Sequence, residues 1–196
     1  MPGLVRAYRR FIASTRGVAA IEFAAILPVM LILLLTTFDV GNAIAVYLKV
    51  RSATFTMAAV TNQYSINSPI QAADMTAITG ATSQVLAPYP SSPVVVVISQ
   101  LAISKAGNTT ATVDWSATLN GAALSVGSSV NLPTSISSLT TCGTYPCYLI
   151  FSQVSYKYTP LFGTFGTGIT LSDSEFVTPR SSTCIPYVPQ TGTTCP

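Results

Sequence analysis

The feature that most constrains this sequence is a long apolar run near its N-terminus. Residues 18–38 read VAAIEFAAILPVMLILLLTTF and contain one charged residue, Glu22. A helix rises about 1.5 Å per residue, so a segment of this length spans about 31 Å, the thickness of the hydrocarbon core of a bilayer. The run therefore predicts a transmembrane helix. Burial in a soluble protein is the weaker interpretation, because nothing else in the chain could surround such a helix on all sides.

The charges that flank this run predict its orientation. On its far side only Lys49 and Arg51 lie close. Arginines beside a transmembrane helix stay in the cytoplasm, so the N-terminus is expected inside and the rest of the chain outside, with the lipid bilayer as a partner. The first 16 positions contain no acidic residue and four of the nine basic residues, namely Arg6, Arg9, Arg10 and Arg16.

The remaining composition excludes several classes of function. From residue 18 onward there are five basic and six acidic residues, so the chain lacks the clustered Lys and Arg of a nucleic-acid-binding surface. The sequence contains no histidine, which excludes Ser-His-Asp and Cys-His nucleophiles and histidine-bound metals. We expect no enzyme, no cofactor, no metal site and no nucleic acid as a partner.

An ordinary secretory signal peptide is the alternative for this N-terminus, with Ala43-Ile44-Ala45 as its cleavage site. Two features argue against it, because the apolar run is longer than a typical signal core and contains Glu22. A charge at the centre of a membrane helix costs roughly 2.5–3.5 kcal/mol, so a carboxylate there indicates a function. The alternative interpretation is that Glu22 reaches the lipid headgroups from a helix that serves as a membrane anchor alone.

The residues around Glu22 carry a family resemblance. A glycine followed by an apolar helix with Glu at its fifth position and an aromatic residue at its sixth, as in residues 17–23 (GVAAIEF), resembles the class III signal of type IV pilins and pseudopilins. Residues 16–24, read with Leu27-Pro28, resemble the N-terminal segment of the TadE-like pseudopilins of the tight-adherence (Tad, Flp) pilus system. The close resemblance covers residues 16–51, about a fifth of the chain.

This resemblance implies a processing site and an assembly site. A prepilin peptidase would cut between Gly17 and Val18, where glycine places no Cβ beside the scissile bond. Glu22 would then lie one turn into the new helix, followed by Phe23, and would pair with the N-terminal amine of a neighbouring subunit. Pro28 is expected to weaken one backbone hydrogen bond and allow a kink.

Two functions follow from the resemblance. The first is a minor pseudopilin in the bacterial inner membrane, with its C-terminal domain in the periplasm, that enters or primes a surface pilus for adherence. Its implied partners are the prepilin peptidase, other pilin or pseudopilin subunits and the Tad secretion machinery. The second is an uncleaved, membrane-anchored periplasmic binding or assembly module that enters no filament.

The rest of the chain is expected to form a small α+β head. Residues 1–17 form the basic leader, 18–38 the membrane helix, 39–66 a periplasmic extension of that helix and 67–196 the periplasmic domain. A second helix is expected over 69–86, with Ser68 as N-cap and Gly80 as its weak point. The extension is expected to pack on the head through a stripe at helical spacing, formed by Val40, Ile44, Tyr47, Leu48, Phe55, Ala58 and Ala59.

Four segments have the composition of antiparallel strands. Residues 92–103 and 110–119 predict one hairpin, and 147–158 with 168–177 predict a second pair joined across 159–163. This joining turn, of the pattern YxYxPL, also resembles TadE-like proteins. Residues 120–141 predict a loop with at most one strand. The expected fold is α+β, a long N-terminal transmembrane and amphipathic helix followed by a small antiparallel-sheet head.

Four cysteines lie on the predicted outer side, at positions that fit disulfides in an oxidising periplasm. They are Cys142, Cys147, Cys184 and Cys195. Three pairings are possible and the sequence does not choose between them, although the two local loops, 142–147 and 184–195, are preferred. A zinc site is the alternative, but these spacings are poor for zinc. The tail after Arg180 is expected to be irregular and held by a disulfide.

Overall fold

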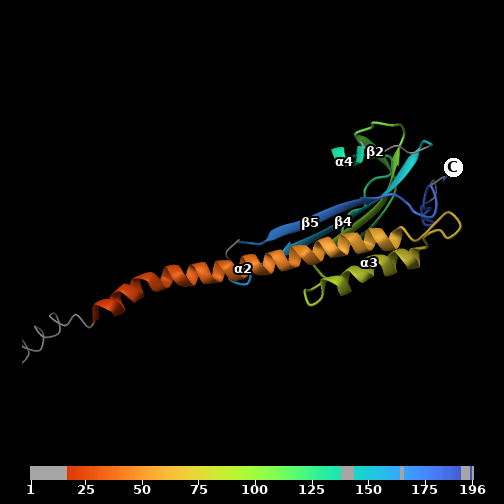
Figure 1. Cartoon of the computed structure of the whole chain (residues 1–196). Helices are drawn as coiled ribbons and strands as arrows, with labels where there is room; N and C mark the ends of the chain where they lie inside the picture. Colours follow the sequence, from red (N-terminus) through yellow and green to blue (C-terminus); the bar gives the residue numbers. More distant parts are fainter. Residues whose placement is uncertain (1–16, 138–143, 164–165, 191–194, 196) are drawn as a thin grey trace, which may run out of the picture.

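The computed structural model describes residues 17–137, 144–163, 166–190 and 195. A long helix leads into a sheet that lies over its C-terminal half (Figure 1). The elements in chain order are α2 (Val18–Thr61), α3 (Ala72–Leu86), β1 (Val94–Ile103), β2 (Thr110–Leu119), β3 (Ser129–Asn131), α4 (Thr134–Ser137), β4 (Cys147–Tyr158) and β5 (Ile169–Val177). The predicted α+β fold is confirmed.

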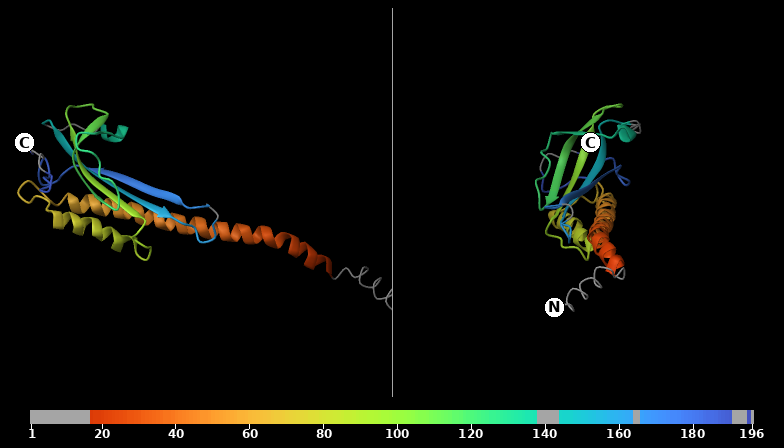
Figure 2. Two further views of the ribbon diagram at one scale, coloured as in Figure 1. Left: turned by 180° about the vertical axis from the view of Figure 1, so that it is seen from behind. Right: turned by 90° about the vertical axis from the view of Figure 1, so that its left-hand side faces the viewer.

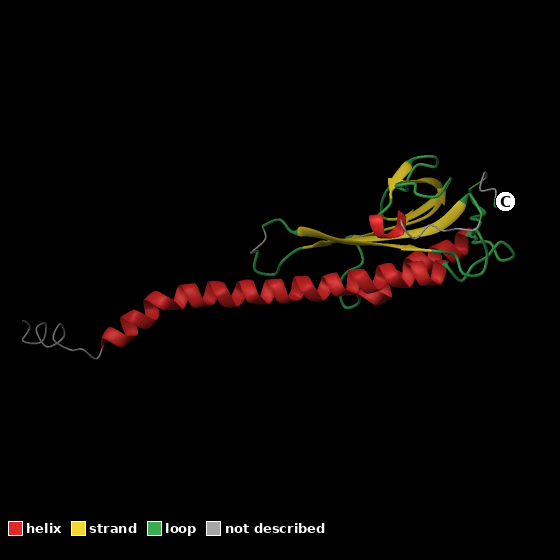
Figure 3. Ribbon diagram, turned by 45° about the horizontal axis from the view of Figure 1, so that its top comes forward, coloured by secondary structure: helices red, strands yellow, loops and turns green. Residues whose placement is uncertain are grey.

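Five strands form one curled antiparallel sheet in the order β3-β2-β1-β4-β5 (Figure 3). Both predicted pairs are present, since β1 pairs with β2 and β4 pairs with β5. The two pairs join through β1 and β4, with Val94 opposite Tyr156 and Ile103 opposite Cys147. The predicted loop over 120–141 contains the short strand β3 and the four-residue helix α4 among its described residues.

The second half of α2 and α3 cover one face of the sheet (Figure 2). We call this packed part, from residue 39 onward, the head. Its main core lies between the helices and the sheet, where apolar side chains are removed from water. The fully buried members include Val46, Val50, Met57, Leu86, Val96, Ile98, Trp115, Ile150, Val154 and Ile185.

A β-bulge divides the sheet between two cores. Gln100 pairs with Trp115 but the next residue, Leu101, pairs with Val113, so Asp114 is the extra residue on β2. An extra residue reverses the faces of the side chains beyond it. Trp115 therefore packs toward the helices, while Val113 joins a second core on the other side with Leu101, Ile103, Leu149 and Phe151.

The predicted packing stripe of α2 is wrong for most of its members. Val40, Ile44, Leu48 and Phe55 are 39%, 56%, 57% and 44% exposed. Tyr47 and Ala59 are also exposed, and Ala58 alone of the predicted set is buried. The face against the sheet carries smaller and more polar side chains, namely Asp39, Ala43, Val46, Val50, Ala53, Thr54, Met57, Ala58 and Thr61. Because α2 is apolar on both sides, its hydrophobic pattern does not indicate which side meets the sheet.

The connection between the helices also differs from the expectation. Helix α2 ends at Thr61 rather than at residue 66, and the Asn62 side chain accepts a hydrogen bond from the Arg180 backbone N–H at 2.9 Å. Helix α3 begins at Ala72, where Gln71 and Asp74 form a capping box. The predicted N-cap, Ser68, instead forms a small bridge with Ser65.

The C-terminal tail is irregular, as predicted, but hydrogen bonds rather than a disulfide fasten it to the head. Cys184 is bonded to Cys195, one of the two preferred local pairs. The indole N–H of Trp115 donates to the Ile185 carbonyl at 2.7 Å, and the Ile185 N–H donates to Gln100 Oε1 at 2.7 Å. Tyr187 forms a parallel bridge with Ile70. The tail therefore closes the end of the head that lies far from the N-terminal half of α2 (Figure 1).

Candidate membrane anchor and processing site

The N-terminal half of α2 extends beyond the head with its apolar side chains exposed. Ile21, Phe23, Ile32 and Leu34 are 72%, 65%, 64% and 64% exposed. Helix α2 is long and apolar enough to cross a membrane, and none of its most apolar 18-residue window is buried. A helix satisfies its backbone hydrogen bonds internally, as the hydrocarbon requires. The segment fits a membrane anchor, because water would be a costly surrounding for these side chains.

Gly17 and Val18 lie at the start of this anchor. Gly17 is the N-cap of α2, with φ −93° and ψ −11°, and it provides no side-chain cap. A Cβ placed on Gly17 would meet nothing within 4 Å. Neither packing nor backbone conformation therefore requires glycine at this position.

Glu22, Phe23 and Pro28 lie along the exposed part of the anchor. Glu22 follows Gly17 by five residues, so it lies just beyond the first turn of α2, which contains no acidic residue. Pro28 is inside the helix, and α2 bends in the half that contains it (Figure 1). A proline removes one backbone hydrogen bond, which is a sufficient cause of a bend.

Asp39 forms a junction between the anchor and the head that the sequence did not reveal. It is fully buried, and its carboxylate accepts hydrogen bonds from the backbone N–H groups of Leu161 at 3.1 Å and Phe162 at 3.3 Å. The Tyr158 hydroxyl donates to the Asp39 carbonyl at 3.3 Å. Asp39 is the first charged residue after the apolar run, which is the one local signal that marks it.

The environment of this junction raises the pKa of the Tyr158 phenol. Burial raises the pKa of the Tyr158 phenol above its usual value, and the nearby charge of Asp39 and the phenol of Tyr89 act in the same direction. The phenol therefore stays protonated and remains a hydrogen-bond donor to Asp39. Gly168, at φ +110°, completes the turn, because a Cβ there would lie 2.6 Å from the Tyr158 carbonyl oxygen.

The other predicted site residues lie apart from the anchor. Cys184 and Cys195 are at the far end of the head, and Cys147, at the start of β4, is disulfide-bonded. Its expected partner, Cys142, lies outside the described residues. The four predicted topology residues, Arg6, Arg9, Arg10 and Arg16, also lie outside them. Within the described part of the chain, no three His, Cys, Asp or Glu residues gather as a metal site would require.

Comparison with known families bears on the anchor. Residues 17–58 match the family model described as TadE-like protein. This segment is TadE-like. The match begins at the proposed cleavage site and ends within α2, so it covers the anchor and most of the packed half of that helix. No curated protein and no solved structure matches the chain.

The TadE-like segment confirms the resemblance predicted from residues 16–51. It connects the chain with a family of pilus structural and assembly proteins, and so with a component associated with a Tad pilus. The sheet and α3 lie beyond the matched residues. The match therefore includes the part of α2 that packs in the head and none of the sheet.

Proposed function

We propose that this protein is a minor pseudopilin of a Tad/Flp pilus, a membrane-anchored structural and assembly component that serves surface adherence. A prepilin peptidase cleaves it after Gly17, and α2 then anchors it in the inner membrane with the head in the periplasm. Glu22 pairs with the N-terminal amine of a neighbouring pilin or pseudopilin subunit. The Tad secretion machinery moves or holds the processed protein.

One observation carries this proposal. The TadE-like match starts at Gly17, and the helix that follows is largely exposed and apolar as far as Phe38, with Glu22 as its one charge. Such a helix needs lipid or other apolar helices around it, and its carboxylate needs a cationic partner. A processed neighbouring subunit in a membrane supplies both.

The test is the N-terminal residue of the mature protein, compared between two glycine variants. Gly17→Ala is expected to block cleavage. Gly41→Ala is the matched control, because a Cβ at Gly17, the N-cap of α2, or at Gly41, within α2, meets nothing within 4 Å, so neither variant disturbs packing. Mass spectrometry of membranes should give Val18 as the first residue of the wild type and of Gly41→Ala. Met1 in the wild type would support the uncleaved module instead, and a start near Val46 would identify an ordinary signal peptide.

A further inference from the structure

We propose that the turn between β4 and β5 contacts the bilayer and seats the head on the membrane surface. We call residues 159–163, together with Phe38, the lipid-facing turn. The proposed occupant of this surface is the headgroup region of the leaflet from which α2 emerges. The inference rests on the proposed function in one respect, which is that residues 18–38 span the membrane.

Hydrogen bonds fix the height of the lipid-facing turn relative to the anchor. Asp39 directly follows Phe38, the last residue of the apolar run. Its carboxylate binds the N–H groups of Leu161 at 3.1 Å and Phe162 at 3.3 Å. A helix rises about 1.5 Å per residue, so the turn lies at the level where the hydrocarbon ends and the headgroups begin.

The side chains of the turn are those expected at a lipid surface. Leu161, Phe162 and Phe38 are 74%, 47% and 52% exposed. Phe38 and Phe162 make an edge-to-face contact with centroids 5.7 Å apart, so apolar surface on the turn continues that of the anchor. Neighbouring exposed apolar side chains on a soluble domain mark an interaction surface.

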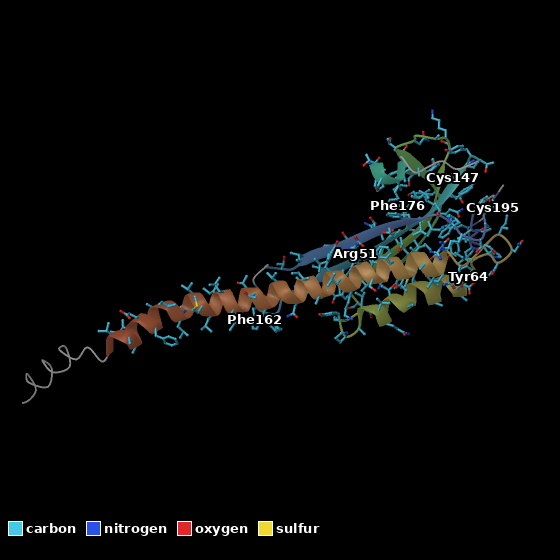
Figure 4. The ribbon with its side chains drawn as sticks, viewed as in Figure 1. Arg51, Tyr64, Cys147, Phe162, Phe176 and Cys195 are labelled. Carbon is cyan, nitrogen blue, oxygen red and sulfur yellow. A yellow bond between two sulfur atoms is a disulfide. The ribbon has the colours of Figure 1, made fainter. Side chains whose placement is uncertain are left out.

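The turn between β1 and β2 lies at the opposite end of the sheet and differs from the lipid-facing turn in polarity. Residues 104–109, between β1 and β2, read SKAGNT and are polar. They lie beside the start of β4, since Ile103 pairs with Cys147, whereas the lipid-facing turn follows Tyr158 at the other end of that strand. Figure 4 labels Phe162 beside α2, near where the anchor leaves the head, and Cys147 far from it. The apolar turn is thus the one that the anchor brings to the membrane.

A hollow beside the turn has the side chains of a membrane interface. It has a volume of about 570 Å³, and its lining includes the half-buried Tyr89 and the exposed Lys157 and Leu161, whereas Tyr156 and Tyr158, which also line it, are buried in the core. Of the three tyrosines, Tyr89 keeps exposed surface, and such a ring suits the junction of hydrocarbon and headgroups because one end is apolar and the other is polar. The Lys157 ammonium, on its flexible stem, suits a headgroup phosphate.

The test uses tryptophan fluorescence in liposomes whose lipids carry bromine atoms near the top of the acyl chains. Full-length Phe162→Trp and Leu161→Trp are reconstituted in brominated and in ordinary phosphatidylcholine. We expect the brominated lipid to remove roughly half or more of the emission that each new tryptophan adds, because bromine quenches at contact and interfacial rings reach this depth. The native Trp115 is fully buried and gives a constant background.

Ala106→Trp, at the tip of the polar hairpin turn, is the matched control and should show no such loss. Equal quenching at Ala106→Trp and Phe162→Trp would overturn the inference. Protection of Phe162→Trp from both brominated lipid and aqueous acrylamide would also overturn it, because protein would then cover the turn. Flotation of the liposomes tests the anchor separately: a wild-type chain that does not float contradicts the proposed function and the inference together, whereas floating without quenching contradicts the inference alone.

Discussion

One carboxylate lies inside the anchor and another directly follows it, and the two have opposite surroundings. Glu22 projects from an exposed helix into the proposed membrane, whereas Asp39 is buried in the head and accepts backbone hydrogen bonds. A carboxylate in lipid is costly unless it is paired. A buried carboxylate that receives N–H groups is stabilised where it lies. Under the proposed function the first carboxylate pairs with a neighbouring subunit, whereas the second binds backbone N–H groups of the head to its own helix.

Glu22→Ala is expected to leave cleavage after Gly17 intact and to impair pilus assembly. The substitution removes the charge that pairs with a neighbouring N-terminal amine but leaves the glycine at the scissile bond unchanged. Mass spectrometry reports processing, and the yield of sheared surface pili reports assembly. Glu22→Asp, which keeps the charge, is the control and should retain more assembly. Equal piliation by Glu22→Ala and the wild type would contradict the proposed role.

Asp39→Ala is expected to destabilise the head by about 1–3 kcal/mol, because the N–H groups of Leu161 and Phe162 lose a charged acceptor. Asp39→Asn keeps one acceptor oxygen and should cost less. Urea unfolding in detergent, followed by the emission of the buried Trp115, measures both. Asp173→Ala, on the partly exposed strand β5, is the control and should change stability by less than about 0.5 kcal/mol. Similar losses for Asp39→Ala and Asp173→Ala would contradict the junction.

At the scale of the element, α2 is one helix in two surroundings. Its first half exposes apolar side chains on all sides, as a membrane helix does. Its second half buries one face against the sheet and leaves Ile44, Leu48 and Phe55 exposed on the other. Arg51 lies over the Phe55 ring at 5.8 Å, which gives part of this outer face a cationic contact. The helix continues without a break. Its one strong helix breaker, Pro28, lies in the first half and does not interrupt it.

The structure and the sequence pattern predict opposite effects of substitutions on α2, because the pattern placed Phe55 on the packed face and the structure places Met57 there. Met57→Ala is expected to cost about 2–5 kcal/mol, since Met57 is fully buried in the core. Phe55→Ala removes a larger side chain but should cost about 1 kcal/mol or less, because the ring is exposed and contacts the Arg51 cation. Urea unfolding of the two full-length variants compares them. A greater loss for Phe55→Ala would mean that the outer face packs inward.

Part of this architecture follows directly from local sequence. Two hairpins were predicted within two residues of β1, β2, β4 and β5, because β-branched alternation and the turns between strands are local signals. The direction of packing was not predicted. Val46 and Ile44 are similar in hydrophobicity, yet one is fully buried and the other 56% exposed, and the difference is the sheet that lies on one side.

On the scale of the whole molecule, the head should lose stability above pH 10. Burial raises the pKa of Tyr148, Tyr156 and Tyr158 above the usual 10.0. In the window between that value and the raised ones, the unfolded chain has released protons that the folded chain still holds. Stability is therefore fully present below pH 10 and falls as pH rises.

Urea midpoints at pH 8 and at pH 11 measure this loss. Tyr156→Phe, which removes one of the three phenols, should show a smaller fall between the two pH values than the wild type. A fall of equal size in both proteins would contradict a contribution from Tyr156.

The sequence by itself determined the long apolar helix that fits a membrane anchor, the TadE-like start, the α+β class and the strand pairs. Each of these depends on residues that are close in the chain, whether as an apolar run, a spacing or an alternation. The pairing of Cys184 with Cys195, only 11 residues apart, was preferred from the sequence without excluding the other pairings, and the structure contains this bond.

Only the tertiary structure decided how the anchor meets the head. The carboxylate of Asp39 binds an N–H group 122 residues away, and Asn62 binds one 118 residues away. The bulge at Asp114 moves Val113 and Trp115 into different cores. Such contacts have no signature in the neighbouring sequence, because each partner is an ordinary turn, cap or strand residue until the fold brings the two together.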